Sequence, residues 1–105
     1  MWGFFMPNVL FIFKTNYITN YMKELYSFKV KNREDFTKFL DLLLKDYLEE
    51  PASWENKTVP EFLEALSAYS ADIQGYYNNT KQAINADTPT WATFADIFLG
   101  AKVYE

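Results

Sequence analysis

The sequence contains no cysteine and no histidine, and it has only three glycines and four prolines among 105 residues. Without thiol or imidazole groups, the chain cannot form disulfides, thiolate nucleophiles, Ser-His-Asp triads, Cys/His zinc sites or histidine general bases. Three scattered glycines make no phosphate-binding loop. Most familiar active sites are therefore excluded, and we expect a protein that is not an enzyme and holds no cofactor or metal.

Basic side chains are also in deficit, with 10 Lys and Arg against 14 Asp and Glu. A net charge of −4 repels a phosphate backbone, which argues against nucleic acid as a partner. The apolar run from Trp2 to Phe13 is interrupted by Pro7 and Asn8, and it is shorter than the roughly 20 residues that a membrane-crossing helix needs. It also lacks the basic start of a secretory signal. We therefore expect a cytoplasmic protein with no membrane partner.

Residues 1–21 differ from the rest, because they hold seven of the 21 aromatic side chains and a single charge, Lys14. We favour Met22 as the natural start, which would make the upstream residues an over-extended reading frame. A strand-forming or loosely packed extension is the second interpretation, and a membrane or export signal is the third. The corresponding division is an extension over 1–21 and a single helical domain over 22–105.

The segment from Leu25 to Lys31 alternates apolar and polar residues, a period typical of a half-buried strand. A lone strand needs a neighbour, and the candidates are Val9–Phe13 and Ala101–Tyr104. The pattern therefore predicts one or two short strands at most.

A helix is predicted from Arg33 to Glu49, with Asn32 as its N-cap and Pro51 beyond its end. Its apolar residues recur with helical spacing and should face the core; they are Phe36, Phe39, Leu40, Leu43, Leu44, Tyr47 and Leu48. Leu42 interrupts the acidic outer face, either as a scattered surface leucine or as a contact for the N-terminal segment or a partner. The candidate partner-binding residues are therefore Leu42, Asp41, Asp46, Glu49 and Glu50.

Two more helices are indicated by their start signals. Thr58 and Glu61 form a capping box around Pro60, and the apolar positions from Phe62 to Tyr76 follow, with Gly75 and Asn78-Asn79 marking a frayed end. Thr88 or Thr90 can cap a third helix of about ten residues that carries Trp91, Phe94 and Phe98 and ends at Gly100. The fold class is mainly α: a three-helix core with at most one or two short N-terminal strands.

Four segments carry a resemblance to known proteins: NREDFTKF at 32–39, WENKT at 54–58, FLEAL at 62–66 and WATFADIFLGAKVYE at 91–105. Over about residues 25–105 the chain resembles a small bacterial family of uncharacterised acidic domains. The resemblance implies a single small domain without an assigned activity, of a kind that often accompanies toxin systems as an immunity protein. It implies no catalytic residue.

Two hypotheses for function follow. The first is a non-enzymatic binding domain whose acidic, aromatic-rich surface engages a basic protein such as a toxin, because acidic surfaces speed association with basic partners. The alternative is a small carboxylate- or metal-dependent enzyme with a pocket between its helices.

Overall fold

The computed structural model describes residues 20–105, with side chains from Glu24 onward. This part of the chain is helical and contains no strand, which confirms the mainly α fold class. The elements, in chain order, are α3 (Asn20–Ser27), α4 (Arg33–Glu49), a single 3-10 turn η2 (Pro51–Ser53), α5 (Val59–Asn79) and α6 (Trp91–Ala101). The interpretation of the segment before Met22 falls almost wholly outside the described residues and stays a prediction.

The strand predicted from Leu25 to Lys31 is wrong. Residues up to Ser27 belong to α3, and residues 28–31 form an irregular link to α4. Leu25 is buried because it packs on α4, and a short alternating window cannot distinguish that contact from a strand face. Of the two proposed pairing partners, Ala101–Tyr104 forms the turn that ends α6, and Val9–Phe13 lies outside the described residues.

The helix starts follow the predicted caps. The side chain of Asn32 accepts a hydrogen bond from the backbone N–H of Asp35, and Thr90 does the same for Thr93. Thr58 and Glu61 form the reciprocal capping box, in which each side chain accepts a hydrogen bond from the backbone N–H of the other residue. Since each cap satisfies N–H groups that the helix leaves unpaired, these local signals are sufficient to locate three helix starts.

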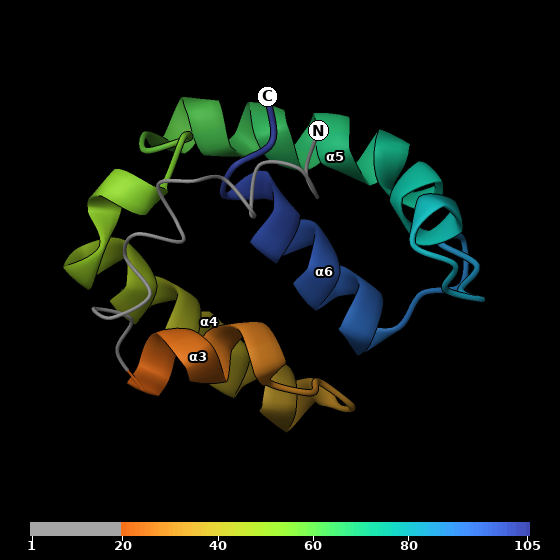
Figure 1. The fold of residues 1–105 in the computed structure, drawn as a ribbon, viewed down its shortest axis with the longest axis horizontal. Helices are drawn as coiled ribbons and strands as arrows, with labels where there is room; N and C mark the ends of the chain where they lie inside the picture. Colours follow the sequence, from red (N-terminus) through yellow and green to blue (C-terminus); the bar gives the residue numbers. More distant parts are fainter. Residues whose placement is uncertain (1–19) are drawn as a thin grey trace.

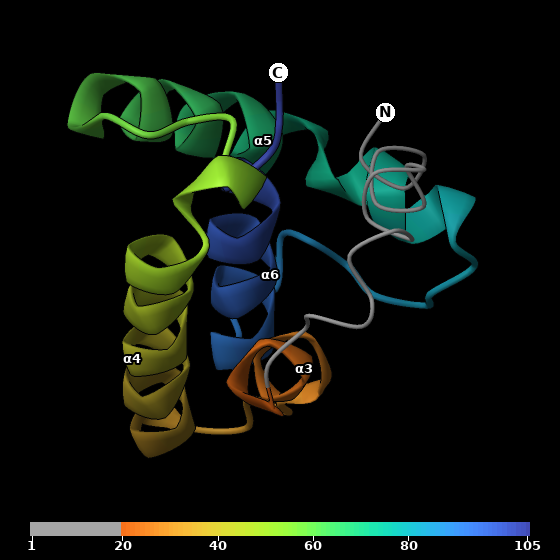
Figure 2. The same cartoon turned by 60° about the vertical axis from the view of Figure 1, so that its left-hand side comes forward.

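Helix α6 is the centre of the fold. Both α4 and α5 pack against it, and α3 packs against α4 (Figure 1). In a second view α4 and α6 run side by side, while α5 crosses them near their C-terminal ends (Figure 2). The helices α4 and α5 have few direct contacts with each other, and each packs against α6.

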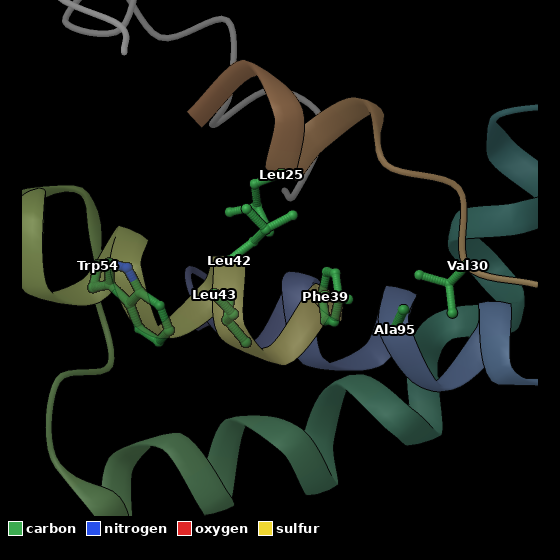
Figure 3. Packing of buried hydrophobic residues seen from close by; sticks show 7 residues of the cluster. All are labelled: Leu25, Val30, Phe39, Leu42, Leu43, Trp54 and Ala95. Atoms are coloured by element: carbon green, nitrogen blue, oxygen red, sulfur yellow. The ribbon is translucent and has the colours of Figure 1, made fainter. Parts of the chain in front are cut away.

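The main core lies between α3, α4 and α6. Leu25 of α3 points toward Leu42 of α4, and Phe39 and Leu43 of α4 belong to the same cluster as Ala95 of α6 (Figure 3). Leu42 is only 9% exposed. The prediction that Leu42 lies on an exposed, acidic face of the helix is therefore wrong, because α3 covers that position.

A smaller core joins the C-terminal half of α5 to α6 through Tyr69, Ile73 and Tyr77. Here the two helices approach so closely that a methyl group on Gly100 would overlap the ring of Tyr69. Gly100 does not end α6, which continues to Ala101. Gly75, expected near the end of α5, instead lies inside it, with open space where a side-chain Cβ would be.

We expect Gly100→Ala to lower the free energy of unfolding by about 1–3 kcal/mol, because the buried ring of Tyr69 has to move. A domain of this size then melts at least several degrees lower, at about 4–8 °C per kcal/mol. Thermal melts followed by circular dichroism measure the change.

Gly75→Ala is the matched control, since it makes the same substitution in a helix with room for the methyl group. Alanine is the better helix former by about 1 kcal/mol, so this variant should melt higher than the parent. Equal shifts for the two variants would contradict the role assigned to Gly100.

Candidate functional site

An ion pair lies inside the molecule between α4 and the end of α6. Lys102 Nζ is 2.8 Å from Asp46 Oδ2, and both side chains are almost completely buried, at 1% and 0% exposure. The indole N–H of Trp54 donates to the same Asp46 oxygen at 2.8 Å, and Lys102 Nζ donates to the hydroxyl of Tyr26 at 2.6 Å. The cluster therefore ties together α3, α4, the loop after η2 and the C-terminal turn.

The carboxylate of Asp46 is only partly satisfied. Its second oxygen, Oδ1, is buried and has no hydrogen-bond partner in the part of the chain that the structure describes. Lys102 also stands over the Trp54 ring, 5.9 Å from its centre, where the electron-rich face stabilises the ammonium group. Buried charges of this kind are tolerated only when each finds its partner, so the two residues depend on each other.

The loop after η2 is bound to the same C-terminal turn through Asn56. Its side-chain amide donates to the carbonyl groups of Ala101 and Tyr104, at 2.9 and 2.8 Å. The backbone N–H groups of Glu55 and Asn56 donate to the Lys102 carbonyl. These bonds satisfy carbonyl groups that the end of α6 leaves unpaired. They also hold the WENKT segment in direct contact with the AKVYE segment.

A groove opens where α4 and α5 diverge on either side of α6. One hollow of about 340 Å³, here called the leucine hollow, is lined mainly by Leu40, Leu44 and Tyr47 of α4 and by Val59, Phe62 and Leu63 of α5. The second, the phenylalanine hollow, has about 530 Å³ and is lined by Phe36 of α4, by Leu66, Ser67 and Ser70 of α5, and by Phe94 and Ile97 of α6. Phe98 of α6 contributes to both hollows, so they adjoin over the same helix.

The walls of the leucine hollow are unusually exposed for apolar side chains. Leu44, Val59 and Leu63 are 56%, 71% and 57% exposed, and Leu48, one turn beyond Leu44, is 66% exposed. The expectation that Leu40, Leu44 and Leu48 face the core is wrong, because α5 diverges from α4 and leaves that stripe uncovered. Scattered leucines need no explanation, but a stripe shared by two helices is a candidate contact surface.

The ion pair and the groove are connected through Trp54. Its ring lines the leucine hollow and packs against Tyr47, edge to face at 5.1 Å between ring centres, and against Phe62 at 5.7 Å. The hydroxyl of Tyr47 donates to the Lys57 carbonyl at 2.9 Å, which holds the loop against α4. The buried charges therefore help to set the shape of one groove wall.

The candidate partner-binding residues separate into two groups. Asp46 and Leu42 are buried, so their assignment to an exposed face is corrected: one belongs to the ion pair and the other to the contact with α3. Asp41 and Glu49 are exposed and Glu50 is half-buried, which leaves them available to a partner. The structure brings Asp41 next to the leucine stripe, because it precedes Leu44 by one helical turn.

Sequence reasoning missed the ion pair because its two members are far apart in the chain. One signal was present: Asp46 follows Phe39 by seven residues and Leu42 by four, which is the spacing of the buried face. A single acid at a buried position predicts a buried cation elsewhere. Lys102, between Ala101 and Val103, is the cation that meets it.

A second polar contact lies in the smaller core. The hydroxyl of Tyr77 donates to Asp96 Oδ2 at 2.7 Å, and it lies 3.3 Å from Thr93 Oγ1. Burial raises the pKa of Asp96 above its ordinary value, while the hydrogen bond from Tyr77 and the charge of Lys29 oppose that rise. Burial also raises the pKa of Tyr77.

These acidic groups do not converge on the groove. Neither hollow has an Asp or Glu in its lining, and residues 20–105 contain no group of three or more Asp or Glu side chains placed to hold a metal ion. Within the same residues, no helix combines the length and apolar character required to span a bilayer. The groove therefore offers a ligand mainly apolar contact, and Lys57 is the one charged side chain among the residues that line the two hollows.

Removing one member of the ion pair should be costly. We expect Lys102→Met to lower the free energy of unfolding by about 3–5 kcal/mol, because the buried Asp46 carboxylate loses its counter-charge. Lys38→Met is the control: it removes the same charge from an exposed pair with Glu34, whose worth is about 0.2–0.5 kcal/mol. Urea denaturation of the two variants gives the comparison, and similar losses would contradict the assigned role.

The raised pKa of Asp96 predicts a pH dependence of stability. The folded chain binds this proton at a higher pH than the unfolded chain does, so the contribution of Asp96 to stability decreases as pH rises through the window from its ordinary pKa to the raised one. Asp96→Asn keeps an acceptor for Tyr77 and removes the half-buried charge. We expect it to melt higher than the parent at pH 7 and to lose that advantage near pH 4.

Glu61 is the control with the opposite sign. Hydrogen bonds from the backbone of Thr58 and Lys57 lower its pKa, so its contribution is present above its ordinary pKa and is lost as pH falls. Glu61→Gln should therefore melt below the parent at pH 7, and the difference should shrink in acid. If the difference in melting temperature from the parent had the same sign for both variants at pH 7, the assignment for Asp96 would be wrong.

Comparison with known proteins gives one match. No curated protein and no solved structure matches the chain. A family model described as a family of unknown function, DUF7660, matches residues 32–105, which include both members of the ion pair, Trp54, Asn56 and all the lining residues of the groove named above. The chain therefore belongs to the DUF7660 family of unknown function.

Proposed function

We propose that this protein is a non-enzymatic binding domain for a basic protein, and that the groove between α4 and α5 is its binding surface. The observation that carries the proposal is the exposed apolar stripe on two neighbouring helices, formed by Leu44 and Leu48 of α4 and by Val59 and Leu63 of α5. Each of these side chains is more than half exposed. Covering such a stripe with a partner recovers the hydrophobic free energy that the isolated chain leaves unused.

The charge of the molecule supports a basic partner. Residues 32–105 hold 13 of the 14 acidic side chains but only six of the 10 basic ones, and the buried pair uses one of each. Asp41 and Glu64 are exposed, one on each of the two helices that form the walls of the leucine hollow. Lys57 lines that hollow, but Glu61 lies beside it and offsets its charge. A second copy would bring like charges together, whereas a basic surface is attracted.

The resemblance noted in the sequence suggests which basic protein to test first. Small acidic domains of this kind often accompany toxins as immunity proteins. The more specific proposal is therefore that the protein neutralises a basic toxin domain in the cytoplasm. The alternative, a carboxylate-dependent enzyme, has less support, because neither hollow has an Asp or Glu in its lining.

The proposal predicts capture of a basic protein from the source cells by the tagged full-length chain. Leu44→Gln with Leu63→Gln should abolish that capture, since placing a polar amide where an apolar side chain meets the partner weakens binding by roughly tenfold or more at each position. Ile84→Gln is the matched control, because it removes an exposed apolar side chain from the loop between α5 and α6. Quantitative mass spectrometry at low and high salt measures the captured amount and the identity of the protein.

Electrostatic steering makes the capture weaker at high salt, and Asp41→Asn with Glu64→Gln should reduce it at low salt. Capture that survives the two leucine substitutions would place the interface elsewhere. Failure to capture any basic protein at low salt would count against the proposed function itself.

A further inference from the structure

Helix α3 is attached to the rest of the described chain mainly through α4. Among residues 24–27, only Leu25 is buried, and the half-buried Tyr26 accepts a hydrogen bond from Lys102 Nζ at 2.6 Å. A helix of eight residues is not stable by itself, so contacts of this kind are what hold α3 in place.

We propose that α3 is a hinged strap, which opens and closes as a unit while α4, α5 and α6 stay folded. Closure of the strap is relayed through Lys102 and Asp46 to Trp54, which lines the leucine hollow. The strap therefore controls how firmly one wall of the groove is held. It works in the isolated chain, so it is independent of the proposed function and goes beyond it.

The chain is anchored just after α3, which locates the hinge. Val30 is 7% exposed and belongs to the main core, and the backbone N–H of Lys31 donates to Asp35 Oδ2 at 3.0 Å. Figure 3 shows the irregular link between α3 and Val30. Between this anchor and the end of α3 lie only Phe28, partly buried, and Lys29, exposed. A change in the backbone angles of these two residues swings α3 away without moving α4.

The family match begins where this link ends. It starts at residue 32, so α3 lies outside the part of the chain that the family model covers. Asn32 caps α4 from within the matched part, by accepting from the backbone N–H of Asp35. The start of α4 therefore needs no contribution from α3, as a strap that opens independently requires.

Opening of the strap changes the surroundings of the buried ion pair. In the closed state Tyr26 covers Lys102 with its hydroxyl and with its ring, whose centre is 5.1 Å from Nζ. Lys102 and the indole N–H of Trp54 both bind Asp46 Oδ2, each at 2.8 Å. When Tyr26 leaves, water reaches the ammonium group, and the attraction between the two charges weakens in the higher dielectric. The carboxylate is then less firmly fixed, and so is the Trp54 ring that it orients.

Native-state hydrogen exchange of the full-length chain, followed by NMR, tests whether α3 opens on its own. We expect the amides of residues 24–27 to share one protection factor, at least about a hundredfold lower than that of the most protected amides in α5 and α6. Leu25→Ala should lower it about tenfold or more, because a buried leucine is lost. Leu48→Ala is the matched control: this leucine of α4 is 66% exposed and lies outside the hollow lining, and its truncation should leave α3 unchanged.

A variant in the smaller core separates strap opening from unfolding of the whole chain. Ile73 of α5 is 1% exposed and belongs to that core, so Ile73→Val should lower the protection of α5 and α6 by about two- to tenfold. Because α5 and α6 stay folded when the strap opens, the protection of α3 should not change. An equal loss in α3 would overturn the strap, since α3 would then open only with the whole chain.

The relay is tested at the indole N–H of Trp54, which donates to Asp46. Tyr26→Phe keeps the ring and removes only the hydroxyl that accepts from Lys102. We expect the Trp54 indole proton to exchange about threefold or more faster in this variant, and its resonance to move.

Tyr104→Phe is the control for the relay, because it removes a hydroxyl that binds Asp72 instead of the ion pair. The Trp54 signal should stay where it is in the parent. An unchanged Trp54 signal in Tyr26→Phe, or an equal change in both variants, would overturn the relay. Faster indole exchange in Tyr26→Phe alone, together with independent exchange of α3, would support both the strap and the relay.

Discussion

The buried ion pair between Asp46 and Lys102 is the interaction on which most of the structure depends. It joins the last turn of α4 to the residue that follows α6, and Tyr26 and Trp54 bring α3 and the loop after η2 to the same point. Apolar contacts alone could slide by a turn, whereas two buried charges must meet in one geometry. The pair therefore determines how the C-terminal end of α6 lies against α4, and it holds α3 and the loop after η2 to the same point.

The groove is a consequence of this arrangement rather than a separate feature. Helix α6 packs against both α4 and α5, and the absence of a side chain at Gly100 lets Tyr69 bring the middle of α5 close to the end of α6. Since α5 crosses α6 there, its N-terminal half diverges from α4 and leaves the leucine stripe uncovered. An equally apolar stripe would be buried if α5 lay parallel to α4, so the crossing of α5 over α6 exposes the leucines.

The local part of this fold could be predicted from sequence, and the long-range part could not. Caps at Asn32, Thr58 and Thr90 are local hydrogen bonds, so three helix starts were evident from a few residues each. Helix α4, however, has apolar residues on more of its circumference than one core contact can cover. Which side is buried depends on α3, misread as a strand, and on Lys102, 56 positions away from Asp46. The sequence therefore predicted correctly that α4 is amphipathic. It placed Leu44 and Leu48 in the core and Leu42 and Asp46 on the outer face, whereas the structure has the reverse.

The buried and exposed residues of α4 therefore have different roles: the first stabilise the fold, and the second are accessible for binding. Leu42 and Asp46 are buried, and each makes a contact that another helix or the C-terminal turn requires. Leu44, Leu48 and Leu63 are mostly exposed, so the folded chain gains little from them. Trp54 belongs to both groups, because its N–H binds Asp46 while its ring lines the leucine hollow. Through this one residue, the charge pair that orders the fold also sets the shape of the surface that the fold leaves open.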